Sequence, residues 1–163
     1  MKSFCLAAIL AVTISADASD FPKDSFNHSG CHLSATFDQQ SCDTVYALMD
    51  NIIRQWANGD ACAASGHPGH YSIYEEQNDS YIWSKRLTAD GKYTDDQLFQ
   101  FAETDAGCQV TGKSNSESIS MYDYGVNFCN LWNVYNAVGG ATVSKASHCS
   151  VDPSNPVTTC ARY

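Results

Sequence analysis

The stretch "VYALMDNIIRQW", residues 45–56, carries the clearest structural signal in this chain. Its apolar side chains recur three or four positions apart, which is typical of a helix that buries one face: Val45, Leu48, Met49, Ile52, Ile53 and Trp56. Ser41 or Asp43 can cap the start of this helix by accepting hydrogen bonds from free backbone N–H groups. Gly59 can adopt the left-handed conformation that ends it. We therefore expect one amphipathic helix with Trp56 in the core.

After this helix the periodicity changes to two. Residues 71–76 and 81–86 alternate along an extended chain, although aromatic residues lie on both faces. Asn78 and Asp79 stand between the two segments, and both residue types tolerate a positive φ. This arrangement predicts a β-hairpin.

Three further features continue the sheet. Residues 90–91, Asp-Gly, predict a turn, and residues 96–103 read as a third strand. Residues 108–128 then predict a long extended segment, in which the apolar side chains change faces part of the way along. Because a strand cannot change faces without an extra residue, we expect a bulge or bend near Met121 and Tyr122.

The stretch "NFCNLWNVYN", residues 127–136, places an asparagine at every third position: Asn127, Asn130, Asn133 and Asn136. Both an extended and a helical conformation fit this pattern. In either one, the large side chains pack inward while the asparagines bond to backbone groups or face water. The alternative is a row of asparagines that faces a ligand.

One helix followed by four or five antiparallel strands predicts an α+β domain, in which the helix packs on a curved sheet. Cystatin-like and NTF2-like rolls have this architecture, and the resemblance is one of architecture alone. Cystatins carry a Gln-x-Val-x-Gly hairpin, whereas residues 109–112 here read Gln-Val-Thr-Gly, one residue short. No family residues are therefore carried over.

Residues 1–18 have the features of a secretory signal peptide: a basic start, a short apolar run and a small-x-small site that ends at Ala18. No segment is long and apolar enough to span a bilayer, so we expect no membrane insertion. Residues 19–40 are polar and without a clear pattern, and predict an N-terminal arm. Residues 41–163 predict a single disulfide-stabilised domain, and we expect a secreted, extracellular protein.

The formal net charge of −9 limits the partners. Proteins that bind nucleic acids or anionic membranes carry clusters of Lys and Arg, which this acidic chain does not contain, so we expect neither partner. A cation, a basic protein or a neutral glycan stays compatible with the composition.

Seven cysteines follow the predicted signal peptide: Cys31, Cys42, Cys62, Cys108, Cys129, Cys149 and Cys160. In an oxidising compartment they should pair, and an odd number leaves one over. We expect Cys149 to pair with Cys160, because a tail that contains Pro153 and Pro156 would otherwise fray. We expect the leftover cysteine to be buried and inert; the alternatives are a bridge that links two chains into a disulfide-bonded homodimer and, less favoured, a nucleophile.

Two sequons, at Asn27 and Asn78, predict surface N-glycosylation. Cys62, His67 and His70 lie close together in sequence, but their spacing is not a standard ligand signature, so we expect no metal site and no cofactor.

The carboxylates Glu75-Glu76 and Asp95-Asp96 form two adjacent pairs. Neighbouring strand residues point to opposite faces, so neither pair alone can supply both groups of an acid-base site. We therefore expect no catalytic residues and interpret both pairs as charged strand edges that resist aggregation. A small hydrolase that uses one carboxylate from each strand is an alternative.

Aromatic residues gather in the hairpin region and form the predicted binding surface: Tyr71, Tyr74, Tyr81, Trp83 and Tyr93. The sequence thus favours a secreted, acidic, non-enzymatic protein that binds an extracellular protein or a glycan. Another alternative is a matrix or filament subunit that is cross-linked through the odd cysteine.

Overall fold

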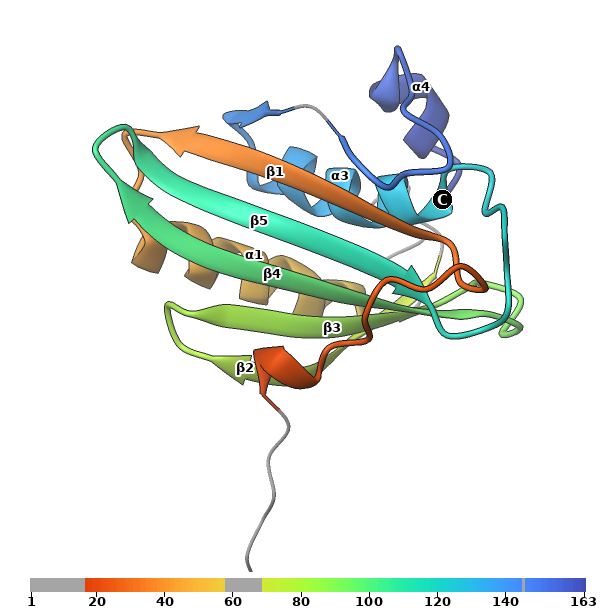
Figure 1. Ribbon diagram of the computed structural model, residues 1–163. Helices are drawn as coiled ribbons and strands as arrows, with labels where there is room; N and C mark the ends of the chain where they lie inside the picture. Colours follow the sequence, from red (N-terminus) through yellow and green to blue (C-terminus); the bar gives the residue numbers. More distant parts are fainter. Residues whose placement is uncertain (1–16, 58–68, 145) are drawn as a thin grey trace, which may run out of the picture.

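The computed structural model describes residues 17–57, 69–144 and 146–163. They form a mixed α+β fold, in which helices cover one face of a single antiparallel sheet (Figure 1). The predicted α+β class and its stabilisation by disulfides are confirmed. Among the described residues, no helix has the length and apolar character needed to cross a membrane. Residues 1–16 of the predicted signal peptide lie outside the described part of the chain.

The sheet has six strands, not the four or five predicted, in the order β2-β3-β4-β5-β1-β6. Their bounds are β1 (Gly30–Asp38), β2 (His70–Gln77), β3 (Tyr81–Leu87), β4 (Thr94–Thr104), β5 (Gly107–Ser116) and β6 (Ala141–Val143). Every neighbouring pair is antiparallel. The predicted hairpin joins β2 to β3, and Asp79 in its turn has a φ of 59°. Strands β2 to β5 therefore form a meander, and β1 is added beside β5.

Strand β1 corrects the prediction that residues 19–40 form an unpatterned arm. Its inner face is fully buried by Cys31, Leu33, Ala35 and Phe37, while the residues between them are only half-buried. This is strict alternation with a period of two. The sequence pattern was weak because half of the inward residues are cysteine and alanine, which are small and give little contrast with their polar neighbours.

The predicted amphipathic helix is confirmed as α1 (Cys42–Trp56). Ser41 caps it, since Ser41 Oγ accepts a hydrogen bond from the backbone N–H of Thr44 at 3.3 Å. The helix ends at Trp56, and Gly59 lies outside the described residues. Its buried face contacts the inner face of the sheet. Leu48, which the pattern placed on that face, is 39% exposed.

A second helix, α3 (Val126–Val138), contains the asparagine-rich stretch. It lies beside α1 on the same face of the sheet (Figure 1). The helical alternative for residues 127–136 is therefore the correct one. The extended segment predicted for residues 108–128 ends at Ser116 with β5. Of the bulge or bend predicted near Met121 and Tyr122, the bend is present at Met121, outside any strand. The chain then turns through the left-handed residues Tyr124 and Gly125 into α3.

Six cysteines form three disulfides: Cys31–Cys149, Cys42–Cys108 and Cys129–Cys160. The predicted Cys149–Cys160 pair is wrong, because Cys149 lies beside β1 whereas Cys160 ends the short helix α4 (Pro156–Cys160), which contacts α3. Pro156 fits the first turn of α4, where its missing N–H is not needed. Cys62 lies outside the described residues.

The N-terminal segment crosses the face of the sheet opposite the helices and includes the short helix η1 (Ala18–Asp20) (Figure 1). Phe21 of this segment packs edge-on against Trp83, with ring centroids 5.3 Å apart. Tyr81 and Leu98 complete this second, smaller apolar cluster. Both faces of the sheet are therefore covered in the region of β3 and β4.

Candidate functional site

A pocket of about 300 Å³ lies where β3 turns into β4 and where β5 ends. We call it the tyrosine-rimmed pocket. It is lined by Thr88, Tyr93, Asp95, Ser116, Ser118, Ile119, Ser120, Tyr122, Asp123, Tyr124 and Val126. Its volume falls at the lower end of the range for small-molecule sites.

The rim of the pocket is apolar and exposed. Tyr93 is 56% exposed, Tyr122 53% and Tyr124 70%. The rings of Tyr122 and Tyr124 meet edge-on, with centroids 4.9 Å apart, and Ile119 beside them is 82% exposed. A cluster of exposed apolar side chains around a concavity is typical of an interaction site.

The rim loop, residues 117–125, is held by backbone contacts. Its Ser120 N–H donates to the Asn27 carbonyl at 2.9 Å, which ties the loop to the N-terminal segment. Tyr124 has a φ of 57°, an uncommon conformation for a tyrosine. This left-handed turn carries the chain into α3 and leaves the ring of Tyr124 in solvent.

Asp95, on the inner face of β4, forms part of the base of the pocket and is 3% exposed. Its Oδ1 accepts a hydrogen bond from Ser116 Oγ at 2.8 Å, and its Oδ2 accepts one from Asn130 Nδ2 at 2.9 Å. Burial raises the pKa of Asp95, against the opposing effects of these two hydrogen bonds and of the charge on Arg86. The buried guanidinium of Arg86 places Nη1 3.9 Å from Asp95 Oδ2.

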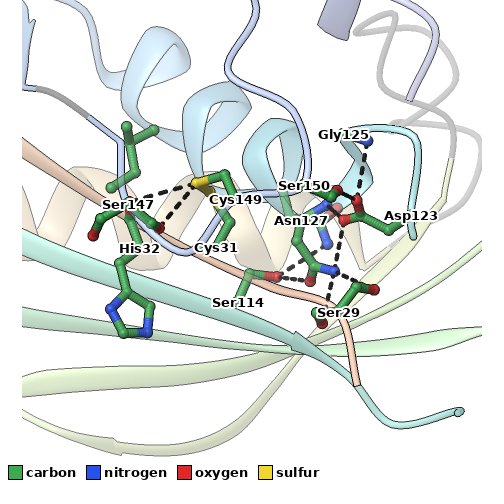
Figure 2. Close-up of a disulfide and its surroundings, with 12 residues drawn as sticks. Ser29, Cys31, His32, Ser114, Asp123, Gly125, Asn127, Ser147, Cys149 and Ser150 are labelled. Atoms are coloured by element: carbon green, nitrogen blue, oxygen red, sulfur yellow. Dashed lines mark hydrogen bonds between the residues drawn. A yellow bond between two sulfur atoms is a disulfide. The ribbon is translucent and has the colours of Figure 1, made fainter. Parts of the chain in front are cut away.

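Asp123, the second carboxylate of the pocket, organises the start of α3 (Figure 2). Its Oδ1 accepts from the backbone N–H of Gly125 at 3.1 Å and from the Ser150 hydroxyl. Its Oδ2 accepts from the backbone N–H and from the side-chain Nδ2 of Asn127, both at 2.7 Å. The negative charge sits at the N-terminal end of α3, where the helix dipole favours it.

The asparagine row of α3 is mainly structural. Asn127 is buried, donates to the Ser29 carbonyl at 3.1 Å and accepts from Ser114 Oγ at 2.7 Å (Figure 2). Asn130 links Asp95 to Ser114. Asn133 donates to the carbonyls of Cys160 and Tyr163 at the C-terminus. Asn136, the fourth, is exposed.

The tyrosine-rimmed pocket contains one of the five aromatic residues predicted to bind. Tyr71, Tyr81 and Trp83 are at most 5% exposed, so their ring faces are unavailable to a ligand. Tyr74 is 53% exposed but lies outside the pocket, where it packs on Trp83 with Lys85 above its ring. Tyr93 is the exception, and it lines the pocket.

The interpretation of the acidic pairs as charged edges is wrong for Asp95 and Asp96. Both are 3% exposed, because β4 is an interior strand between β3 and β5. As expected, their side chains face opposite sides of the sheet, and Asp96 accepts from Trp83 Nε1 at 2.8 Å. Edge strand β2 does carry Glu75 and Glu76, both half-buried.

The two predicted glycosylation sites lie at the surface. Asn27 and Asn78 are both exposed, as an accepted glycan requires. Cys62 and His67 lie outside the described residues, and His70 is exposed at the start of β2.

Sequence reasoning missed the rim loop and two inward-facing serines of β5, of which Ser116 lines the pocket and Ser114 bonds to the asparagines of α3. Ser114 and Ser116 share the inward parity of Cys108 and Val110 on β5. Polar residues on a core-facing parity were the available signal for a buried polar network.

Comparisons with known proteins give no family. No protein-family model matches this chain, and no curated protein matches it. Among solved structures, it is similar to the crystal structure of protein CV1439 from Chromobacterium violaceum, at 10% sequence identity and a TM-score of 0.26. The similarity covers 69% of this chain and 91% of the other, and at this level it carries no argument about fold or function.

Proposed function

We propose that this protein is a secreted, non-enzymatic binding protein and that its tyrosine-rimmed pocket binds a neutral glycan. The observation that carries the proposal is the exposure of Tyr93, Tyr122 and Tyr124 around a pocket of about 300 Å³. Solvent-exposed tyrosines combine an apolar ring with a hydroxyl group that can donate or accept a hydrogen bond.

The chemistry of the lining favours a sugar over other small ligands. A sugar ring has apolar C–H faces, which suit tyrosine rings, and hydroxyl edges, which can bond to Ser118 and donate to the hydroxyl oxygens of Thr88 and Ser120. The net charge of −9 and the carboxylates Asp95 and Asp123 disfavour an anionic ligand. Neutral saccharides are thus the best match.

The hydrogen bonding of the two pocket carboxylates supports binding over catalysis. All four carboxylate oxygens of Asp95 and Asp123 accept hydrogen bonds from the protein. A general base or nucleophile needs an oxygen that can reach the substrate. Asp95 is also only 3% exposed, so we assign these hydrogen-bonded carboxylates to shaping the pocket.

A small glycosidase is the second candidate, because Asp95 and Asp123 line one pocket and burial raises the pKa of Asp95. A raised pKa is the property of a general acid. These two residues would replace the strand pairs that the sequence suggested.

The fold analogy and the two glycosylation sites remain predictions. The analogy with cystatin-like or NTF2-like rolls stays an analogy of architecture, and glycosylation of Asn27 and Asn78 stays a prediction.

The matrix-subunit alternative depends on Cys62, which lies outside the described residues. Non-reducing electrophoresis tests it, since a disulfide-linked ladder would favour that alternative.

The test is a glycan array probed with the mature chain, residues 19–163, followed by calorimetric titration of the best saccharide. We expect saturable 1:1 binding without release of a hydrolysis product. An array without signal contradicts the glycan proposal. Turnover of the bound saccharide that disappears in Asp95→Asn would instead establish the glycosidase.

A further inference from the structure

We propose that Asp24, His32 and His148 form a binding site for Zn²⁺ on the outer side of β1. One carboxylate oxygen and two imidazole nitrogens of these residues lie within 4.8 Å of one another. Asp24 lies in the N-terminal segment, His32 in β1, and His148 in the segment that follows β6. None of the three lines the tyrosine-rimmed pocket, so this site is separate from the proposed glycan site.

The distances are close to those of a coordinated ion. His32 Nε2 lies 3.0 Å from Asp24 Oδ1, and the rings of His32 and His148 have centroids 4.7 Å apart. Ligand atoms about 2.0 to 2.2 Å from a tetrahedral zinc ion are about 3.4 Å from each other. The Asp24–His32 pair is now in hydrogen-bond contact and is slightly closer than this, so a small displacement of the exposed Asp24 side chain would admit the ion. His148 is exposed, so a rotation of its side chain can bring its ring nitrogen to the same point.

The disulfide Cys31–Cys149 holds the two histidines together, because each histidine is the sequence neighbour of one of its cysteines. The Cα atoms of Cys31 and Cys149 are 4.1 Å apart. Successive side chains of a strand point to opposite faces, so Cys31 faces the core while His32 points away from it (Figure 2). The backbone of His32 also exchanges two hydrogen bonds with Ser147, at 2.8 and 3.0 Å.

The conformation of His148 fits this arrangement. Its φ is 57°, in the left-handed region that few residues other than glycine adopt. The backbone bridge at Ser147 precedes it and the disulfide at Cys149 follows it, so both flanks of His148 are fixed. The imidazoles are therefore placed near each other by the fold alone, which lowers the entropy lost when an ion is bound.

The donor set matches zinc. Two imidazole nitrogens and one carboxylate oxygen are a recurrent set of three protein ligands, with the fourth position left to water or to an external donor. The negative charge of the chain as a whole attracts cations. Lys113, the cross-strand neighbour of His32 on β5, and Lys23, the sequence neighbour of Asp24, carry charges that oppose binding. The bound ion would connect the N-terminal segment, β1 and the C-terminal segment.

The test is a calorimetric titration of the mature chain with Zn²⁺ in a buffer that does not chelate metals. His32→Gln and His148→Asn each remove one ligand, and asparagine at position 148 tolerates the left-handed backbone. We expect one ion per chain and a loss of affinity of roughly tenfold or more in each variant. His70→Ala is the control, since this exposed histidine lies at the start of β2, away from the site.

A second readout separates ligation from a change in folding. Long-range ¹H–¹⁵N spectra should show the ring nitrogens of His32 and His148 shifting with zinc, while circular dichroism shows that both variants are folded. Two results would overturn the proposal: no zinc binding by the mature chain, or unchanged binding in His32→Gln and His148→Asn. Loss of binding in His70→Ala alone would also overturn it, and would place the ion near His70 instead.

Discussion

The side chain of Asn130 on α3 donates a hydrogen bond to the buried carboxylate of Asp95 on β4, with Nδ2 and Oδ2 2.9 Å apart. This contact joins a helix to the middle of the sheet directly beneath the tyrosine-rimmed pocket. Asn130 Oδ1 has no hydrogen-bond partner within the described ranges of the chain. Asn130 therefore stabilises the fold through the hydrogen bonds that its amide nitrogen donates.

Replacing Asn130 by alanine should destabilise the protein. The change removes a donor from a buried carboxylate, and leaving such a group unsatisfied costs about 1 to 3 kcal/mol. Urea unfolding measures the difference. Asn136→Ala is the matched control on the same helix, because Asn136 is exposed and alanine has the higher helix propensity. Equal effects of the two substitutions would contradict a specific role for Asn130.

The titration of Asp95 should make stability fall with rising pH. Burial raises the pKa of Asp95 in the folded state, so the folded chain keeps this proton to a higher pH than the unfolded chain does. The contribution of Asp95 to the free energy of unfolding is therefore lost as pH rises from 3.8, its ordinary pKa, through the raised folded pKa. Asp95→Asn removes the part of this slope that Asp95 contributes, while Asp96, whose pKa burial also raises, keeps its own part. Unfolding experiments from about pH 4 to about pH 8 would detect the difference.

The exposed Asp90 serves as the control for that experiment, because its effect on the pH dependence of stability has the opposite sign. Hydrogen bonds from Lys92 and Thr88 lower the pKa of Asp90 to about 2, so its contribution is lost as pH falls. Asp90→Asn should leave the slope above the ordinary aspartate pKa unchanged. If Asp95→Asn also leaves that slope unchanged, another group is responsible for it.

The rim tyrosines should control the affinity for the saccharide. Tyr122→Ala removes a ring that is 53% exposed at the pocket, and we expect about a tenfold loss of affinity, within the range of stacking contacts in recognition sites. Tyr74→Ala removes a ring that is also 53% exposed but lies outside the pocket, so affinity should not change. Calorimetry on both variants makes the comparison, and equal losses would place the ligand elsewhere.

Substitutions at Gly112 and Tyr135 should have non-additive effects on the free energy of unfolding. A Cβ on Gly112 would overlap Tyr135 Oη and would lie 3.1 Å from a methyl carbon of Leu131. Gly112→Ala should therefore destabilise the protein by about 1 to 3 kcal/mol through overpacking. Tyr135→Phe alone loses the hydrogen bond to the Leu33 carbonyl at 2.9 Å, which contributes about 1 kcal/mol. The double variant should be less destabilised than the sum of the two, because phenylalanine makes room for the added methyl group.

Removal of the Cys42–Cys108 disulfide, which links α1 to β5 across 66 residues, should lower the free energy of unfolding by about 4 kcal/mol in the chain-entropy model. The double variant Cys42→Ala/Cys108→Ala tests this by urea unfolding. Both cysteines are at most 3% exposed, so alanine is a fitting replacement. An unchanged midpoint would show that the bridge constrains little of the unfolded chain.

The sequence predicted the elements whose signals lie within a short stretch of the chain. The helix α1 and the β2–β3 hairpin were found because their apolar periods and turn residues lie within one short window. Strand β1 was missed because its inward positions include Cys31 and Ala35, which give a weak contrast. The rim loop was read as a strand, since nothing local shows that Asp123 would fold back onto the start of α3.

The candidate sites depend on strand order and pairing, which the sequence did not supply. Asp95 is buried only because β4 lies between β3 and β5. His32 and His148 meet because the disulfide joins their neighbours and because Ser147 pairs with the backbone of His32. Tyr93 alone was predicted, as a member of a larger aromatic group whose other members are buried or lie elsewhere.

The placement of the disulfides also governs how the chain would respond to proteolysis. Cys149 and Cys160 fasten the C-terminal residues to β1 and to α3, respectively. A protease that cut once between β6 and Cys149 would therefore release no fragment, and the nicked molecule would migrate as an intact chain until a reductant separated its two pieces. Damage in this region would therefore stay hidden wherever the disulfides remain oxidised, because both ends of the cut chain would still be held to the fold.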